Sequence, residues 1–485
     1  MTLRRTGEFA AVSLLLAILL CMFADGDGYE GDDLNSIVPM LYLAEARAGD
    51  FAIYRYDWQP LSYQFGAALV KAFGVRMAFW IAPLSLALGL ACIAMLLRRR
   101  GVGWAYIAAF VLMAPELLFT GLYYNSTALA LACLAAAIWL TAAPSIGRLL
   151  LAGVLIGAAG LFRLDTLAIA TLIAAWSHLN GARIAGVVLM AGASVLTLLA
   201  AIVGGLFSIE GAIEIYSASA AEVVARSDDP GWDQRAKLLI ATMIFSPMGW
   251  VYFLIGGAWA LVRATSTERR RFALLMIAAL PALAPLPDLL SVKYLTPLLL
   301  FAPLLAAEIW RLRPEWRIPP LAPLLFAGTA MTAVVAAALP PVWITAWPSS
   351  DRPREMIRTH DGDRAWGAQI GAIANLHDEQ ARPAAFSHAQ AFLALHAERG
   401  GDIAIIGEED LWLKGGSAWR HMAFQLAADG VAPRVESAGR VVFQTQRGSI
   451  RLFTPESAAR SAQSVGCVID LTWETSTRLL DGPCS

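Results

Sequence analysis

Long apolar runs, separated by short polar connections, fill the chain from its start to about residue 345. Many of these runs have the roughly 17–25 residues that an α-helix needs to cross a bilayer. The pattern predicts an α-helical polytopic membrane protein with about eleven transmembrane helices. The predicted spans are 8–24, 77–97, 103–121, 125–142, 148–163, 165–177, 184–208, 238–262, 272–290, 293–310 and 319–345.

The first span is expected to be an uncleaved helix, because the residues before Asp25 lack the small-x-small pattern of a signal-peptide cleavage site. Orientation follows from the basic residues in short connections, which face the cytoplasm in membrane proteins. With eleven spans, all arginine-rich connections fall on one side, which predicts a cytoplasmic N-terminus. These connections contain Arg4 and Arg5, Arg98–Arg100, Arg148, Arg183, Arg263 with Arg269–Arg271, and Arg311, Arg313 and Arg317.

The opposite, extracytoplasmic side receives three longer polar segments. They are a first outer loop over 25–76, a medium loop over 209–237 and a polar tail over 346–485. We therefore expect a transmembrane domain over 1–345 that is followed by an extracytoplasmic domain.

The tail has the pattern of a small α/β domain. Alternating or continuous apolar positions at Ile403–Ile406 and Val441–Phe443 predict strands, and the stretches 364–376 and 385–398 predict helices.

Composition agrees with a membrane protein: 58% of the residues are hydrophobic and only 15% are charged, against about 25% charged in soluble chains. The net charge of -1 argues against a nucleic-acid partner. No P-loop or GxGxxG segment lies between a predicted strand and helix, so no nucleotide site is expected. Cys467 and Cys484 both lie in the tail, where an oxidising compartment favours a disulfide.

Most charged residues inside the predicted spans gather toward the outer half of the bundle, whereas Glu308 lies near a cytoplasmic end. Such residues are costly in a membrane and usually mark a functional site or a buried pair. Glu116 lies near the outer end of its span, Arg163 and Asp165 lie at an outer turn, and Asp288 and Lys293 flank the next one. The alternative for a single arginine is that it extends to the membrane surface.

The first outer loop begins with clustered carboxylates over residues 25–33. A carboxylate can act as general base toward a sugar hydroxyl, and clustered oxygens also suit a divalent cation. The residues leave both roles open: Asp32 and Asp33 are candidate bases, and Asp25 and Asp27 are candidate metal ligands. A solvated acidic loop is the third reading.

Aromatic and hydrogen-bonding side chains follow over residues 54–63, including Trp58 and Gln59. Aromatic faces stack on sugar rings and also line membrane interfaces, so both a sugar site and an interfacial belt fit this segment.

The order of these features resembles the polyprenyl-phosphate-dependent GT-C glycosyltransferases, the group that contains protein O-mannosyltransferases and lipid A aminoarabinose transferases. The resemblance covers roughly residues 8–300 and rests on Asp32-Asp33, the surface helix expected over Leu34–Ala48, Gly49-Asp50, Gln59-Pro60-Leu61, Phe73-Gly74-Val75-Arg76, Arg163-Leu164-Asp165 and Lys293-Tyr294-Leu295-Thr296-Pro297.

The resemblance implies an inverting enzyme of the bacterial inner membrane with a periplasmic tail. It would move a sugar from a polyprenyl-phosphate donor to an envelope glycan, lipid or protein. Asp32 or Asp33 would be the base, Arg163 and Lys293 would bind the donor phosphate, and Arg76 is a further candidate for that role. The residues expected to line the cavity are Tyr294, Trp58, Gln59 and Glu116.

Three other classes fit a multi-span chain with charged outer loops. A lipid or glycan transporter or flippase also places charges between helices, although this chain lacks the internal repeats that many transporters have. A surface-polysaccharide polymerase or ligase would use similar lipid-linked donors. A non-enzymatic envelope scaffold would use the acidic loop and the tail as docking surfaces.

Overall fold

The structure is a computed structural model. It describes residues 3–23, 60–74, 77–112, 125–206, 265–283, 296–301, 303–305, 307–308, 403–406, 426, 431, 433–435, 441–453, 467–470 and 478–479. The chain forms two compact units: the first contains Met1–Ala24, Asp57–Ser62 and Ala82–Asn375, and the second contains Asp25–Tyr56, Tyr63–Ile81 and Leu376–Ser485. The predicted boundary near residue 345 lies outside the described residues and stays a prediction.

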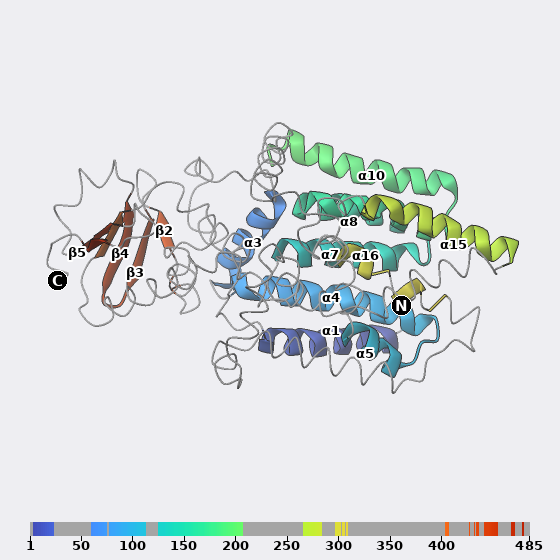
Figure 1. Cartoon of the computed structure of the whole chain (residues 1–485), viewed down its shortest axis with the longest axis horizontal. Helices are drawn as coiled ribbons and strands as arrows, with labels where there is room; N and C mark the ends of the chain where they lie inside the picture. The colour runs from blue at the N-terminus through green and yellow to red at the C-terminus, as the bar shows by residue number, and fades with distance from the viewer. Residues whose placement is uncertain are drawn as a thin grey trace, which may run out of the picture. The chain divides into compact units, whose positions relative to one another are not determined.

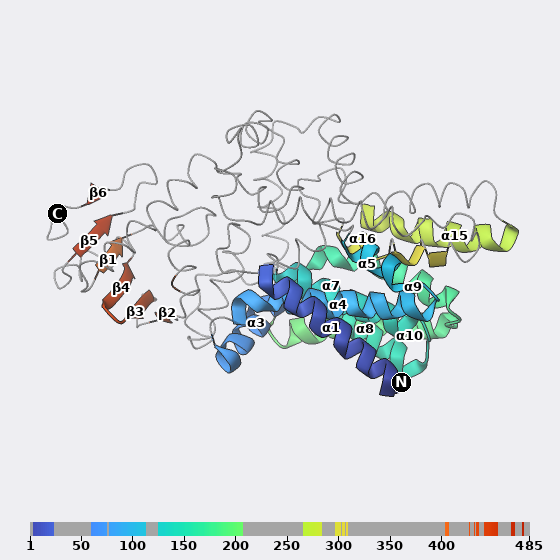
Figure 2. The same ribbon diagram turned by 90° about the horizontal axis from the view of Figure 1, so that it is seen from below.

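The first unit is a bundle of apolar helices, several of which run side by side (Figures 1 and 2). Its described elements are α1 (Leu3–Phe23), most of α4 (Met77–Arg99), α5 (Trp104–Leu112), α7 (Asn125–Thr141), α8 (Ile146–Phe162), the 3₁₀ helix η2 (Leu164–Ile169), α9 (Ala170–Leu179), α10 (Ile184–Val203), α15 (Ser266–Ala279), the 3₁₀ helix η4 (Leu280–Leu283) and α16 (Thr296–Leu299).

Helices lie in each predicted span that overlaps the described residues, whereas the spans 238–262 and 319–345 lie outside them. The total of eleven spans therefore stays a prediction. One boundary differs clearly: α15 begins at Ser266, although the sequence pattern placed the start of that span at 272. Arginine is a good helix former, so the run Arg269–Arg271 continues the helix that follows it.

Helix α3 (Pro60–Phe73) was not predicted, because its residues were assigned to the first outer loop. Pro60 occupies the first helical position, where its fixed φ suits a helix and its missing N–H removes no hydrogen bond. Ser62, Ala67 and Val70 are buried, whereas Gln64 and Lys71 are exposed. This spacing marks an amphipathic helix that starts inside the predicted loop.

Helices α8 and α10 approach each other closely because small residues line their contact. A Cβ added at Gly153 would lie 2.2 Å from the carbonyl oxygen of Met190. Further along, Gly157 faces Ser194 and Thr197. The residue numbers rise together on both helices, so α8 and α10 run parallel. Small residues at this spacing are typical of helix pairs in membranes.

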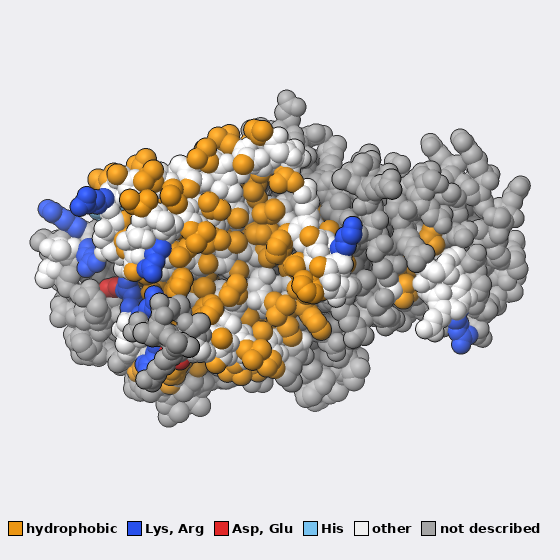
Figure 3. Space-filling view, turned by 180° about the vertical axis from the view of Figure 1, so that it is seen from behind, with side chains coloured by type: hydrophobic (Ala, Val, Ile, Leu, Met, Phe, Trp, Pro, Cys, Tyr) orange, Lys and Arg blue, Asp and Glu red, His pale blue; other side chains and the backbone are white. Residues whose placement is uncertain are grey.

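The bundle keeps a large apolar surface. Along α10, exposed side chains include Ile184 at 73% and Val203 at 88% of their full accessibility, and exposed leucines also cover α1 and α8. Figure 3 shows this apolar surface, with most Lys and Arg side chains gathered at one end of it. Soluble monomers rarely expose apolar patches beyond a few hundred Å². The surface indicates helices that face lipid.

Two helices among the described residues, Trp80–Arg99 and Ile184–Val203, are long enough and apolar enough to cross a membrane. At 1.5 Å per residue, the 20 residues of the latter span about 30 Å, which is the thickness of a hydrocarbon core.

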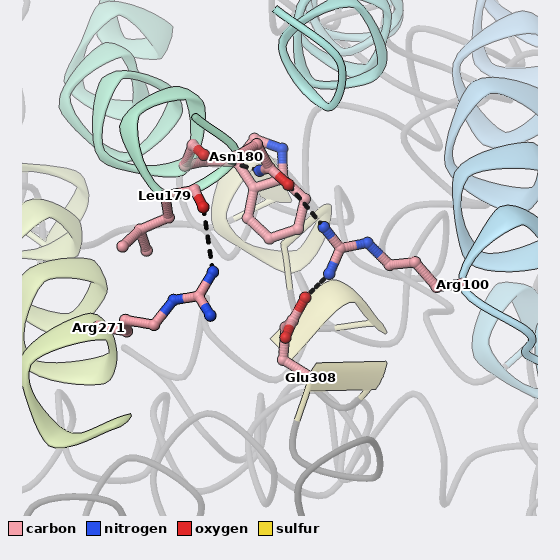
Figure 4. A network of polar contacts seen from close by, with 6 residues as sticks. Arg100, Leu179, Asn180, Arg271 and Glu308 are labelled. Carbon is pink, nitrogen blue, oxygen red and sulfur yellow. Dashed lines mark hydrogen bonds and ion pairs between the residues drawn. The ribbon is translucent and has the colours of Figure 1, made fainter. Parts of the chain in front are cut away.

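The predicted cytoplasmic ends of several helices meet at one end of the bundle, here called the arginine end. Arg100, just after α4, pairs through Nη1 with Glu308 and donates from Nη2 to Asn180 Oδ1 at 2.9 Å. Arg271 of α15 donates to the carbonyl oxygen of Leu179 at 3.0 Å (Figure 4). The arginines after α4 and in α15 therefore share one end with Glu308, as the eleven-span topology predicts.

Aromatic rings complete this end. The Arg100 guanidinium lies 4.4 Å from the ring centroid of Trp176, and Trp176 meets Phe301 edge-on at 6.2 Å. The Arg99 guanidinium lies 5.1 Å from the ring centroid of Trp139 on α7. Such contacts add to the attraction between cation and ring, and they join α4, α7, α9 and the segment after α16.

In the second unit, six strands form one mixed sheet in the order β2-β3-β4-β1-β5-β6. Strand β1 pairs in parallel with both β4 and β5, whereas the outer pairs are antiparallel. The strands predicted at Ile403–Ile406 and Val441–Phe443 are confirmed, and the predicted helices 364–376 and 385–398 lie outside the described residues. The bounds are β1 Ile403–Ile406, β2 Pro433–Val435, β3 Val441–Thr445, β4 Gly448–Phe453, β5 Cys467–Asp470 and β6 Arg478–Leu479.

Candidate functional site

Arg163 lies at the end of α8 that is farthest from the arginine end, since α8 begins beside Arg148 and is 17 residues long. Its backbone leaves the helix in an extended conformation, with φ -161° and ψ 110°, while its N–H still donates to the carbonyl of Ala159. The carbonyl oxygen of Arg163 accepts hydrogen bonds from the hydroxyl and the N–H of Thr166 at 2.6 and 3.1 Å. The main chain therefore fixes Arg163 at a defined turn.

The turn folds tightly back on α8. A Cβ at Gly160 would lie 2.6 Å from the side chain of Leu167, so η2 packs against the glycine face of the helix. Close approach of this kind requires glycine or a shift of Leu167. Asp165 lies on η2 and is thereby held near the end of α8.

The Arg163 side chain bridges two elements of the bundle. Its Nε donates to Asp165 Oδ1 at 2.7 Å, and its Nη1 donates to Thr127 Oγ1 in the first turn of α7 at 2.5 Å. Arg163 is only 7% exposed, and it is the only buried charged residue in the part of the chain that the structure describes. A buried guanidinium needs a carboxylate and further hydrogen bonds to offset its lost hydration.

Residues with hydroxyl groups are neighbours in the chain of the partners Thr127 and Asp165. Ser126, Thr127 and Thr166 are all buried, and the apolar residues Leu161 and Phe162 precede Arg163. Charges interact more strongly in such a poorly hydrated environment than at a surface. The residues Ser126, Thr127, Arg163, Asp165 and Thr166 are here called the Arg163 cluster.

Two further elements lie against η2. They are η4, which ends at Leu283, and α16, which begins at Thr296. Between them in the sequence lies the segment 284–295, which contains Lys293 and Tyr294 and is outside the described residues. Both described flanks of that segment are thus held beside the helix that carries Asp165.

Of the predicted site residues, Arg163 alone is described, and its predicted position at a turn between two short helices is confirmed. That this turn faces the outer side of the membrane stays a prediction. The structure adds Thr127, which the sequence pattern did not single out because a threonine in an apolar helix is common. The predicted site residues outside the described part of the chain are Asp25, Asp27, Asp32, Asp33, Trp58, Gln59, Arg76, Glu116, Lys293 and Tyr294.

The described residues contain no group of three metal-binding side chains. The carboxylates predicted as divalent-cation ligands, Asp25 and Asp27, lie outside those residues. The divalent-cation hypothesis therefore stays a prediction.

No protein-family model and no curated protein matches this chain. Among solved structures, the chain is similar to the crystal structure of ArnT from Cupriavidus metallidurans bound to undecaprenyl phosphate. The alignment covers 97% of this chain and 96% of that chain, with 15% sequence identity and a TM-score of 0.48. A similarity at this level does not assign a family.

Proposed function

We propose that this chain is an integral membrane glycosyltransferase of the GT-C type. It takes a sugar from a polyprenyl-phosphate donor on the extracytoplasmic side of the membrane and passes it to an envelope glycan, lipid or protein. The proposal combines the motif order of residues 8–300 with the chemistry of the Arg163 cluster.

The buried Arg163 is the observation that carries the proposal. The arginine is held by Asp165 and Thr127 at one end of an apolar bundle, far along α8 from the exposed arginines of the other end. A fixed cation in such a site stabilises charge that develops on a phosphate as its sugar leaves. Arginine also matches the planar geometry of phosphate oxygens.

The proposed reaction is a direct displacement at the anomeric carbon. Asp32 or Asp33 takes the proton from an acceptor hydroxyl, and the acceptor oxygen forms a bond to the anomeric carbon. The bond between that carbon and the phosphate oxygen breaks, and both electrons leave with the polyprenyl phosphate. Attack from the opposite face inverts the anomeric centre.

The remaining proposed roles concern binding. Lys293 joins Arg163 on the donor phosphate, and Arg76 is a weaker candidate for the same role. Tyr294, Trp58, Gln59 and Glu116 line the cavity for sugar and acceptor. A divalent cation at Asp25 and Asp27 is the alternative use of the acidic loop.

A lipid-linked donor also agrees with the surface of the bundle. The exposed side chains of α1, α8 and α10 are apolar over most of their length, which favours contact with acyl chains. A polyprenyl tail dissolved in the same membrane would reach the protein laterally, so membrane insertion and donor binding support each other.

The test is transfer from a panel of radiolabelled polyprenyl-phosphate sugars by purified protein supplied with envelope glycan, lipid and protein fractions. The variants are Asp32→Asn, Asp33→Asn and Arg163→Ala. The asparagine variant that removes the catalytic base is expected to abolish sugar transfer and to keep donor binding. Arg163→Ala lowers the transfer rate by about a hundredfold or more, because it removes a donor to the developing charge.

The control variant is Arg447→Ala, an exposed arginine in the turn between β3 and β4, which should keep wild-type transfer. Absence of both transfer and donor binding with every sugar, in folded wild-type protein, would overturn the proposal in favour of a transporter or scaffold. Wild-type transfer by Arg163→Ala would contradict the proposed role of Arg163 in binding the donor phosphate.

A further inference from the structure

Exposed arginines surround the arginine end of the bundle. Arg98 and Arg99 end α4, Arg148 lies in the first turn of α8, Arg183 precedes α10, and Arg270 and Arg271 lie in α15; all six are exposed. Arg271 reaches the end of α9 through its bond to the carbonyl oxygen of Leu179. These side chains therefore form one cationic rim around several helix ends.

Two of these arginines come from neighbouring helix ends. Helices α8 and α10 run parallel, and a Cβ at Gly186 would lie 2.7 Å from the side chain of Leu149. Arg148 is next to Leu149 in the chain, and Arg183 precedes Gly186 by three residues. The first turns of both helices are therefore adjacent, and each carries an exposed guanidinium.

Apolar surface begins directly beside this pair. Ile146 is 67% exposed and lies two residues from Arg148, and Ile184 is 73% exposed and follows Arg183. Exposed Leu150 and Val188 continue the apolar faces of α8 and α10 away from the arginines. The surface thus changes from cationic to apolar within one helical turn.

We propose that the arginine end binds the headgroups of anionic phospholipids, with Arg148 and Arg183 as the central pair. The headgroup phosphate lies between the two guanidinium groups, and the acyl chains lie along the exposed faces of α8 and α10. This inference needs the bundle to lie in a membrane but does not depend on transferase activity.

The positive charge of the arginines and the apolar surface beside them together favour an anionic phospholipid as the ligand. A soluble anion would use the guanidinium groups but gain nothing from Ile146, Ile184 and Val188. A zwitterionic phospholipid would use the apolar faces, but it has no net charge for the arginines to attract. An anionic phospholipid satisfies both parts of the surface, and basic residues at the cytoplasmic leaflet attract such lipids.

The experiment uses the purified full-length chain in neutral detergent. Its equilibrium binding of phosphatidylglycerol and phosphatidylcholine is measured by native mass spectrometry at equal lipid concentrations. The wild type is expected to bind phosphatidylglycerol more tightly. Arg148→Gln/Arg183→Gln is expected to weaken phosphatidylglycerol binding by about 25-fold, roughly fivefold for each arginine, and to leave phosphatidylcholine binding unchanged.

Matched variants make the result specific. Lys71→Gln/Arg447→Gln removes two exposed positive charges elsewhere and should keep the preference. Arg148→Lys/Arg183→Lys keeps both positive charges and should retain most of the preference for phosphatidylglycerol. This variant also tests the site if the glutamine variant unfolds. Equal affinity of the wild type for both lipids, or an unchanged preference in the glutamine variant, would overturn the proposal. Inorganic phosphate that displaces phosphatidylglycerol at equal concentration would overturn the lipid as ligand.

Discussion

Two partners of the Arg163 guanidinium come from different parts of the chain. Asp165 follows it by two residues, so the turn itself supplies the counter-charge, whereas Thr127 lies 36 residues earlier in the chain. Asp165 neutralises the cation, and Thr127 fixes the orientation of its outer nitrogen. We infer that Thr127 is a positioning residue, because it reaches the proposed phosphate site only through Arg163.

Thr127→Val removes the hydroxyl but keeps the shape of the side chain. A hydrogen bond to a charged group contributes about 1.5–3 kcal/mol, so thermal unfolding in detergent should occur at a lower temperature and donor affinity should fall. Thr127→Ser should restore both. Thr141→Val is the matched control, because Thr141 is equally buried on α7 but bonds only to carbonyls of its own helix. Equal losses in the two valine variants would contradict a role for Thr127 in holding Arg163.

At the level of elements, close packing and polar clamps hold the helices at different places. Helices α8 and α10 meet through glycine and small polar residues, where close backbone approach gives many weak contacts. At the arginine end, Arg100 joins α4 to α9 and to the segment after α16. Helix α9 continues directly from η2, which carries Asp165, so the clamp at the other end of α9 also restrains the position of η2.

Gly153→Ala should destabilise the pair α8–α10. The new methyl group would lie 2.2 Å from the Met190 carbonyl oxygen, and overpacking of this kind costs about 1–3 kcal/mol. Gly147→Ala on the same helix has nothing within 4 Å of its added Cβ and should leave the unfolding temperature unchanged or raise it. Thermal unfolding in one detergent measures both, and equal effects would contradict the close contact at Gly153.

Arg100→Leu should destabilise the arginine end strongly. The substitution removes the Arg100 partner of Glu308, whose side chain is only 16% exposed, and removal of one partner of a buried pair costs about 3–5 kcal/mol. Arg100→Leu/Glu308→Leu should recover part of this loss, because the unpaired charge is gone. Arg98→Leu is the control, since Arg98 is exposed on the same helix end. An unfolding temperature of Arg100→Leu no lower than that of Arg98→Leu would contradict the clamp.

At the scale of the whole molecule, the distribution of charge predicts the orientation of the chain in the membrane. Exposed arginines occupy one end of the apolar bundle, and the buried arginine lies at the opposite end of α8. The positive-inside rule predicts that the exposed arginines face the cytoplasm. In that predicted orientation, the Arg163 cluster faces the extracytoplasmic side, where the proposed reaction takes place.

This orientation predicts which engineered thiols are accessible in cells. A membrane-impermeant maleimide should label Arg447→Cys in intact cells with a permeabilised outer membrane, because the sheet is predicted to be extracytoplasmic. Arg148→Cys should react only after the inner membrane is opened. The wild-type chain is the control, because its five natural cysteines give the background labelling. The reverse pattern would invert the predicted topology and move the Arg163 cluster to the cytoplasmic side.

The sequence alone determined where helices lie in the predicted spans that the structure describes, because the length of an apolar run is a local property that the thickness of a bilayer selects. It missed α3 and the early start of α15, where polar residues interrupt the apolar pattern. It also determined that Arg163 separates two short helices, since charged residues interrupt an apolar pattern directly. The resemblance that assigns roles to Asp32, Asp33 and Lys293 rests on local motifs, and the described residues leave those roles as predictions.

Only the tertiary structure decided which residues meet across helices. Thr127 binds Arg163, Glu308 pairs with Arg100, and Gly186 packs against Leu149, although 36 or more residues separate the members of each pair. Helix packing, through contacts such as Gly153 with Met190, determines these distances, and neither periodicity nor composition contains that information. The sequence therefore predicts the helices, whereas their packing creates both cationic sites.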